Sequence, residues 1–316
     1  MNRRRLLPLA VLLALLPGIP ACRQRAATLL NVFNAGSLAY PFRELLAAFV
    51  REHPGTHPTQ ESSGSLEAAR KLTELGKIPD VLAVADYGVI AKLLIPAYTT
   101  WYLGFASNAM VLVYSERSAH AAEISAANWW RILLLPEVRW GLSDPALDPN
   151  GYRAHLVFQL AEAHYGEPGL AQGLNAAIRP GYVRPSEAQL LGLVQAGELD
   201  YAWSYRSLAL TAGLRWVKLP PEVDLSDPQR ANAYAAARIR LPGTRLGSAD
   251  SVEFRGEPIL YALTIPKAAP HPEAARAFVA FVLSAAGQEI LRAAGFVVLD
   301  RPVIVGTPPF EVSGER

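Results

Sequence analysis

The chain has 316 residues, of which 51% are hydrophobic and 18% are charged. This composition is typical of a globular protein rather than a disordered one, and the length allows one large domain or two lobes. The formal net charge is +2, and three of the positive charges are Arg3, Arg4 and Arg5. The rest of the chain is therefore close to neutral and lacks the basic surplus of a nucleic-acid-binding protein.

Residues 1–22 (MNRRRLLPLAVLLALLPGIPAC) predict a secretion signal, because three arginines precede a short apolar run and small residues then precede Cys22. The run is too short and too interrupted by proline to remain as a membrane-spanning helix. We expect export, with Cys22, the only cysteine, lipidated in the mature protein. The alternatives are secretion without a lipid, with Cys22 removed or incidental, and a twin-arginine signal, which the arginine run weakly resembles.

Apolar strands alternate with amphipathic helices along most of the remaining chain. Residues 29–33 (LLNVF) form a buried apolar run, after which Leu38 and Phe49 lie on one face of a helix that Pro54 and Gly55 end. The strands expected in this way are 29–33, 80–85, 110–114, 199–205 and 257–267, and the expected helices are 38–49, 65–75, 129–134, 151–164, 186–196 and a pair within 271–295.

This alternation favours an α/β fold with parallel sheets, in which ligands bind at the carboxyl ends of the strands. Residues 127–205 begin and end in the middle of the pattern, which indicates a second lobe joined to the first by crossing strands, with a cleft between them. We therefore assign 1–22 to the signal, 27–112 to the first part of lobe 1, 113–210 to lobe 2, 211–304 to the completion of lobe 1, and 305–316 to a loose tail.

Four loops of small residues each open an expected helix: NAGSL at Ser37, SSGSL at Ser65, DPNGYR after Asp148, and RPSEAQ at Glu187. A helix start offers unpaired N–H groups and a partial positive charge, and serine adds a hydroxyl donor. Glycine before each serine lets the backbone approach a ligand closely. Together these features predict an anion-binding cleft that also contains two carboxylates.

Each of these residues also has a structural interpretation. Ser37 and Ser65 are good helix N-caps, and Asp148 before a proline is a common turn former. Glu187 in the first turn of a helix is favoured by the helix dipole, and Tyr205 in an apolar strand is more often a core residue than a ligand. The residues alone leave these alternatives open.

The ordered motifs FNAGSL, SSGSLEAARKLTELGKIPDVLAVADY, LSDPALDPNGYR, RPSEAQLLGLVQAGELDYAWSYRS and GEPILYALTIPK extend over most of residues 29–304. In this order they resemble the tungstate/molybdate-binding proteins of ABC importers, specifically the group common in archaea. The resemblance implies a type II periplasmic-binding-protein fold, in which two α/β lobes enclose the ligand around a hinge. It also implies a monomer without a resident cofactor, whose partners are a membrane permease and its ATPase.

In that family two serines hold the oxyanion, and two carboxylates and a tyrosine can approach its central metal. By motif position these roles pass to Ser37, Ser65, Asp148, Glu187 and Tyr205. W(VI) and Mo(VI) can accept oxygen ligands beyond their own four, whereas the sulfur of sulfate cannot. Asp148 and Glu187 would therefore coordinate the metal of tungstate or molybdate and repel sulfate.

Some neighbouring positions bear on this site. Arg153 and Arg184 each lie close in sequence to one of the acids and are candidates to offset its charge, with solvated surface as the alternative. Asn150 stands where relatives often have cysteine, and the resemblance does not require that side chain as a ligand. The connection between the helix at Gly151 and Arg184 is shorter than in those relatives, so the rim of lobe 2 is expected to differ from theirs.

Other functions remain as alternatives. The chain has no G-x-S-x-G motif, and Pro54 and Gly55 separate His53 from His57, so zinc-type spacing is absent. A secreted hydrolase is the alternative from a different class. Among binding proteins, the alternatives are receptors for sulfate, phosphate or ferric iron, and iron is suggested by the even spacing of Tyr201 and Tyr205.

Overall fold

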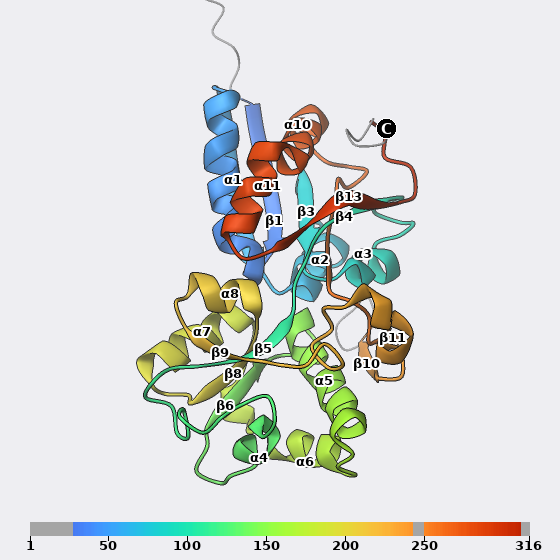
Figure 1. The fold of residues 1–316 in the computed structure, drawn as a ribbon. Coiled ribbons are helices and arrows are strands. Elements are labelled where there is room, and N and C mark those ends of the chain that lie inside the picture. Colours follow the sequence, from blue (N-terminus) through green and yellow to red (C-terminus); the bar gives the residue numbers. More distant parts are fainter. Residues whose placement is uncertain (1–27, 243–249, 311–316) are drawn as a thin grey trace, which may run out of the picture.

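The computed structural model describes residues 28–242 and 250–310. The predicted signal at 1–22, including Cys22, lies outside these residues. Within them, no single helix has the length and hydropathy to cross a membrane, and only α10 (Pro272–Leu283) and α11 (Ala285–Ala293) reach that length together, with a bend of 64° between them. Figure 1 shows the described chain as two lobes, one above the other.

The first lobe is built on a six-stranded sheet in the order β13-β4-β12-β3-β1-β2. Its strands are β1 (Thr28–Ala35), β2 (Thr56–Ser63), β3 (Val81–Val84), β4 (Tyr102–Ser107), β12 (Leu260–Thr264) and β13 (Val297–Val305). Strand β1 runs parallel to β2 and β3, whereas β12 runs antiparallel to β3 and β4. The sheet is mixed rather than wholly parallel, because the chain returns through β12 from the second lobe in the opposite direction.

Helices cover both faces of this sheet. They are α1 (Ala39–Glu52), α2 (Ser65–Thr73), α3 (Tyr87–Leu93), α10 and α11. Helix α1 forms as its sequence predicts, and its apolar face lies against α10, where the Phe49 and Phe278 rings meet edge to face with centroids 5.4 Å apart. Helices α2 and α3 pack together, and Figure 1 places them toward the second lobe.

The second lobe contains a five-stranded sheet in the order β7-β6-β8-β5-β9. The strands are β5 (Met110–Tyr114), β6 (Trp140–Ser143), β7 (Val183–Arg184), β8 (Tyr201–Tyr205) and β9 (Arg215–Lys218), and the helices are α4 (Trp129–Leu133), α5 (Pro149–Tyr165), α6 (Leu170–Ala177), α7 (Glu187–Ala196) and α8 (Arg206–Thr211). Strand β5 pairs antiparallel with both β8 and β9. This sheet is mixed as well, because β6 runs parallel to β7 and β8.

The sheets divide the chain a few residues away from the boundaries expected from the sequence. The expected boundary at 112/113 falls inside β5, and the expected return to lobe 1 at 211 precedes β9, yet both strands belong wholly to the second sheet. Within the expected tail, the Phe310 ring packs edge-on against Trp101 with centroids 5.5 Å apart, and residues 311–316 lie outside the described residues.

A small two-stranded sheet lies beside the junction of the lobes. It consists of the antiparallel pair β10 (Arg238–Pro242) and β11 (Ser251–Arg255), preceded by the short helix α9 (Ala231–Tyr234). Strand β10 packs against α5 of the second lobe, while Lys92 of α3 donates to the Glu253 carbonyl at 3.0 Å. This pair of strands therefore contacts both lobes.

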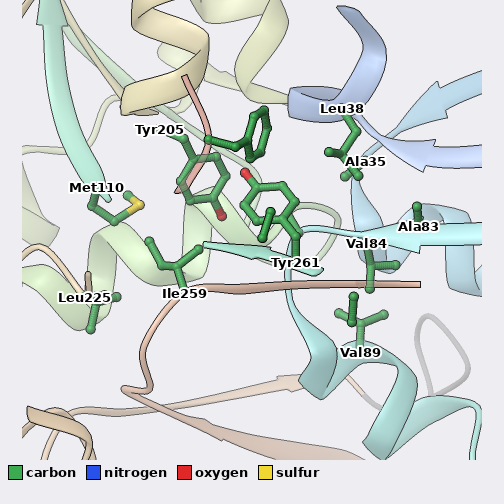
Figure 2. Close-up of a cluster of buried hydrophobic side chains, with 14 of the residues drawn as sticks. Ala35, Leu38, Ala83, Val84, Val89, Met110, Tyr205, Leu225, Ile259 and Tyr261 are labelled. Atoms are coloured by element: carbon green, nitrogen blue, oxygen red, sulfur yellow. The ribbon is translucent and has the colours of Figure 1, made fainter. Parts of the chain in front are cut away.

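One hydrophobic core continues from the first lobe into the second. Figure 2 shows side chains of both lobes packed in this cluster, with Tyr205 and Tyr261 at its centre and Met110 beside them. The rings of Tyr205 and Tyr261 lie 5.8 Å apart, edge to face. A smaller core lies between α7, α8 and the second sheet. The functional groups described below therefore lie beside apolar side chains of both lobes.

Two glycines of the second lobe give a test of the packing. A β-carbon at Gly151 would lie 2.1 Å from the Ser143 carbonyl oxygen, whereas one at Gly192 would meet no atom within 4 Å. We expect Gly151→Ala to destabilise the protein by about 1–3 kcal/mol. Gly192→Ala should stabilise it by about 0.5–1 kcal/mol, because alanine is the better helix former. Urea unfolding of the two variants measures both effects, and equal midpoints would contradict this account.

Candidate functional site

The structure brings all five predicted site residues to the junction of the lobes, and all five are buried. Ser37 lies in the short 3-10 helix Gly36–Leu38, Ser65 begins α2, Asp148 precedes α5, Glu187 begins α7, and Tyr205 ends β8. The first two belong to lobe 1 and the other three to lobe 2. The site is therefore assembled only when the lobes meet.

The two serines present their hydroxyl protons for a further bond. The Ser37 oxygen accepts a hydrogen bond from the Tyr261 hydroxyl at 2.9 Å, and the Ser65 oxygen accepts one from the Ala85 N–H at 3.0 Å. In the described part of the chain, neither serine hydroxyl donates to a protein acceptor within hydrogen-bond distance. Each serine therefore keeps a hydroxyl proton that can be donated to a further acceptor.

The start of α2 has a role that its sequence does not reveal. The N–H groups of Leu66 and Glu67 both donate to the Leu147 carbonyl of lobe 2, at 3.1 and 3.2 Å. A β-carbon at Gly64 would lie 2.2 Å from that carbonyl oxygen. Gly64 thus allows the close approach of the two lobes, and two of the N–H groups expected to bind an anion hold the lobes together instead.

Asp148 joins two helix starts. One carboxylate oxygen accepts from the Asn150 N–H at 3.1 Å and caps α5, and the other accepts from the Glu187 N–H at 3.0 Å at the start of α7. Burial raises the pKa of Asp148 to about 6, although these two hydrogen bonds and the nearby Arg153 act in the opposite direction. Each oxygen keeps a second lone pair that can serve as a ligand.

Glu187 is the exceptional group of the site. Its side chain is 1% exposed, and neither carboxylate oxygen makes a hydrogen bond of normal geometry to the described residues, although the Asn150 amide lies close enough to interact with it. Burial and the neighbouring Asp148 raise its pKa well above the usual value, while Arg153 and the adjacent Asn150 amide lower it. A buried carboxylate without a partner is costly, so this one requires a proton or an electrophilic ligand.

Tyr205 is held by a buried cation. The Arg153 guanidinium donates to the Tyr205 hydroxyl oxygen at 2.8 Å, and also to the Ala85 carbonyl at 2.7 Å in lobe 1. Burial raises the pKa of Tyr205 well above its ordinary value, so the phenol keeps its proton. Because its oxygen already accepts from Arg153, the phenolic O–H is a donor available to a ligand oxygen.

Sequence reasoning missed several supporting residues. Asp86 caps α3, accepts from Tyr152 and forms an ion pair with Arg153, and Tyr261 supports Ser37. Asp86 lies two residues after the end of the buried strand β3, and an acidic residue at this position is the signal that could have identified it. Asn150, set aside as unnecessary, is fully buried beside Glu187.

Of the two arginines expected to offset the charge of the carboxylates, only one lies in the buried cluster. Arg153 lies in the buried cluster, as its proximity to Asp148 suggested. Arg184 does not, because its guanidinium donates to the carbonyls of Gly181 and Val183 in its own loop. The charge near Glu187 is therefore offset by Arg153 rather than by the arginine closest to it in sequence.

The cluster combines hydrogen-bond donors with carboxylates. It offers hydroxyl donors, one buried guanidinium and two carboxylates. No group of three or more His, Cys, Asp or Glu residues in the described ranges is arranged to hold a bare metal ion. Of the tyrosine pair considered for iron, Tyr201 donates its hydroxyl to the Ala119 carbonyl, whereas the Tyr205 hydroxyl accepts from Arg153.

Two α/β lobes closed over a buried polar cluster define the class of bilobal solute-binding proteins. The chain belongs to the bacterial extracellular solute-binding protein family, whose sequence profile matches residues 30–297. A molybdate/tungstate-binding protein WtpA of Pyrococcus abyssi is 37% identical over 317 residues, covering 92% of this chain and 90% of the relative. An uncharacterised solute-binding protein of Petrotoga mobilis is 43% identical over 271 residues, covering 86% and 84%.

Solved structures confirm the fold expected from the resemblance. The periplasmic molybdate-binding protein of Azotobacter vinelandii is similar with a TM-score of 0.57 and 17% identity, over 85% of this chain and 99% of that one. The sulfate-binding protein SubI of Mycobacterium tuberculosis is similar with a TM-score of 0.59 and 16% identity, over 85% and 86%. Both likenesses concern the two-lobed fold alone.

The buried carboxylates give a pH-dependent prediction for the ligand-free protein. A carboxyl group whose pKa rises on folding stabilises the fold below its ordinary pKa, 4.5 for Glu187, and that stabilisation is lost as pH rises toward the folded pKa. We expect the melting temperature to fall between pH 5 and pH 8. In Glu187→Gln it should fall less, and at pH 8 the variant should melt at least about 2 °C higher.

Differential scanning calorimetry across this range measures the effect. The matched control is Glu289→Gln, whose native side chain is 77% exposed, and it should follow the wild type at every pH. A Glu187→Gln variant with the wild-type slope would show that this carboxylate is not buried in the ligand-free protein.

Proposed function

We propose that this protein is an exported receptor that captures tungstate or molybdate between its lobes for import by an ABC permease and its ATPase. The observation that carries the proposal is the buried Glu187 carboxylate, which makes no hydrogen bond of normal geometry to the described residues. Support also comes from the WtpA relatives, which are at least 34% identical to this chain over most of its length. The extracellular family fits the predicted signal at 1–22.

The electrostatics of the cluster favour an oxyanion with a metal at its centre. A fully deprotonated dianion has no proton to offer, so a carboxylate beside it in a dry site is repelled unless it forms a bond to the central atom. W(VI) and Mo(VI) can accept that bond, and hard carboxylate oxygens suit them. The sulfur of sulfate cannot, so Glu187 both attracts one guest and rejects the other.

The cluster divides these tasks between its residues. Ser37, Ser65 and Tyr205 would donate hydrogen bonds to the oxygens of the guest, since the hydroxyl oxygen of each already accepts from the protein. Glu187 would supply an oxygen to the metal, and Asp148, which already accepts two backbone N–H groups, would supply a second.

Ligand binding would also drive the motion of the lobes. Donors from lobe 1 and carboxylates from lobe 2 can act on one guest only in the closed form, so the guest shifts the equilibrium toward closure. We propose that the closed monomer is the form that the permease engages. The proposal includes no catalytic step and no resident cofactor, and Cys22 would carry the lipid that tethers the receptor.

Calorimetric titration with tungstate, molybdate, sulfate and phosphate tests this function. We expect the wild type to bind tungstate and molybdate at least about a thousandfold more tightly than sulfate or phosphate, which corresponds to roughly 4 kcal/mol. In Glu187→Ala, tungstate affinity should fall at least about a hundredfold and the preference over sulfate should shrink. Asp148→Ala should also weaken tungstate binding, and by more than it changes the melting temperature.

A matched control is Glu198→Ala, which removes a carboxylate of lobe 2 outside the cluster and should bind like the wild type. Equal affinity for sulfate and tungstate in the wild type would contradict the proposal and favour a general oxyanion receptor. Turnover of acyl or phosphate esters by the wild type would instead favour the hydrolase.

A further inference from the structure

The first turn of α5 reaches from lobe 2 into lobe 1. Tyr152 donates its hydroxyl to a carboxylate oxygen of Asp86, and the Arg153 guanidinium lies 3.2 Å from the same oxygen. Another nitrogen of that guanidinium donates to the Ala85 carbonyl at 2.7 Å. Three polar contacts to the end of β3 and the start of α3 therefore come from two consecutive residues of lobe 2.

Asp86 is anchored in lobe 1 independently of these contacts. It is the N-cap of α3, and its second carboxylate oxygen accepts from the Gly88 N–H at 2.7 Å. The neighbouring Ala85 N–H donates to Ser65, a candidate ligand residue. Arg153, which contacts Asp86 and Ala85, therefore contacts the segment of lobe 1 that positions Ser65.

The same guanidinium contacts the site in its own lobe. It donates to the Tyr205 hydroxyl oxygen at 2.8 Å while it contacts Asp86 and Ala85. Arg153 and Asp86 are 2% and 8% exposed, so the pair is desolvated in the closed protein. An arginine left buried without its carboxylate would be strongly unfavourable, so the pair makes closure depend on both partners.

We infer that Asp86 and Arg153 form a cross-lobe pair that stabilises the closed form without a ligand, and that Asp86 thereby acts as a positioning residue. By holding Arg153, Asp86 also holds the Tyr205 hydroxyl in the orientation that donates to the guest. The inference that the pair stabilises the closed form does not depend on the proposed function. The inference that Asp86 positions the Tyr205 hydroxyl rests on the proposed function.

The closed form can be trapped by a disulfide. A β-carbon at Gly36 in lobe 1 would lie 3.9 Å from the Ser186 β-carbon in lobe 2, close to the mean spacing of about 3.8 Å in disulfides. A Gly36→Cys, Ser186→Cys protein with Cys22→Ala should therefore form this bond under mild oxidation only when the lobes close. The rate of bond formation, followed on non-reducing gels without any ligand, reports the population of the closed form.

The test compares two buried aspartates in this double-cysteine background. Asp86→Asn keeps an N-cap for α3 but removes the negative charge that Arg153 meets across the cleft. Asp200→Asn is the matched control, because Asp200 also binds an arginine and backbone N–H groups, all within lobe 2. We expect disulfide formation to slow at least about tenfold in Asp86→Asn and to change less than about twofold in Asp200→Asn.

Gly64→Ala serves as the reference for impaired closure, because its methyl group would clash with the Leu147 carbonyl only when the lobes meet. An Asp86→Asn protein that forms the disulfide at the wild-type rate, while Gly64→Ala is slow, would overturn the cross-lobe pair. Equal slowing in Asp200→Asn would also overturn it, since the effect would then be general destabilisation.

The positioning role of Asp86 in ligand binding is tested by a separate measurement, in proteins without the two introduced cysteines. We expect tungstate to dissociate at least about tenfold faster from Asp86→Asn than from the wild type, with a similar association rate, when measured by stopped-flow tryptophan fluorescence. An unchanged dissociation rate would contradict the positioning role. If the wild type binds no tungstate, the proposed function fails, and the trapping experiment still decides the closure part.

Discussion

The constraint on which this structure depends is the burial of a carboxylate that the protein itself does not satisfy. Glu187 lies between the lobes, and neither of its oxygens makes a hydrogen bond of normal geometry to the described residues. Most buried polar groups in proteins are hydrogen-bonded, so such a group indicates a missing partner or a retained proton. Under the proposed function, an electrophilic metal that arrives with its own oxygens would satisfy it, and the closed form would become favourable when that guest is present.

Closure and ligand capture use the same short segments. The loop before α5 supplies the Leu147 carbonyl that the start of α2 binds, and the next residue, Asp148, caps both α5 and α7. Arg153, one turn further on, contacts lobe 1 and Tyr205 together. A displacement of this one segment would therefore change the lobe contacts and the ligand groups at once, which couples binding to motion without a long pathway.

Much of the site was predictable from the sequence because the ordered motifs resemble a known family, whereas the helix starts alone left N-caps and turn formers as alternatives. Ser37, Ser65, Asp148, Glu187 and Tyr205 do lie together in the structure. Strand β2 was missed because it is a polar edge strand that contains Pro58, without the apolar run of a buried strand. The cross-lobe contacts of Asp86 were missed because periodicity places a residue on an element but does not reveal which surface the other lobe presents to it.

Under the proposed function, the balance of charge in the closed cluster would select the guest by its central atom. Asp86, Asp148 and Glu187 are all buried at the junction, and Arg153 is the guanidinium that contacts this group. One cation is already engaged by Asp86 and cannot also neutralise a dianion beside two further carboxylates. A guest of the same charge and shape as tungstate, but with a central atom that accepts no ligand, would meet hydroxyl donors and uncompensated repulsion together. Selectivity then follows from bond formation at the metal, because the donors alone would serve either anion.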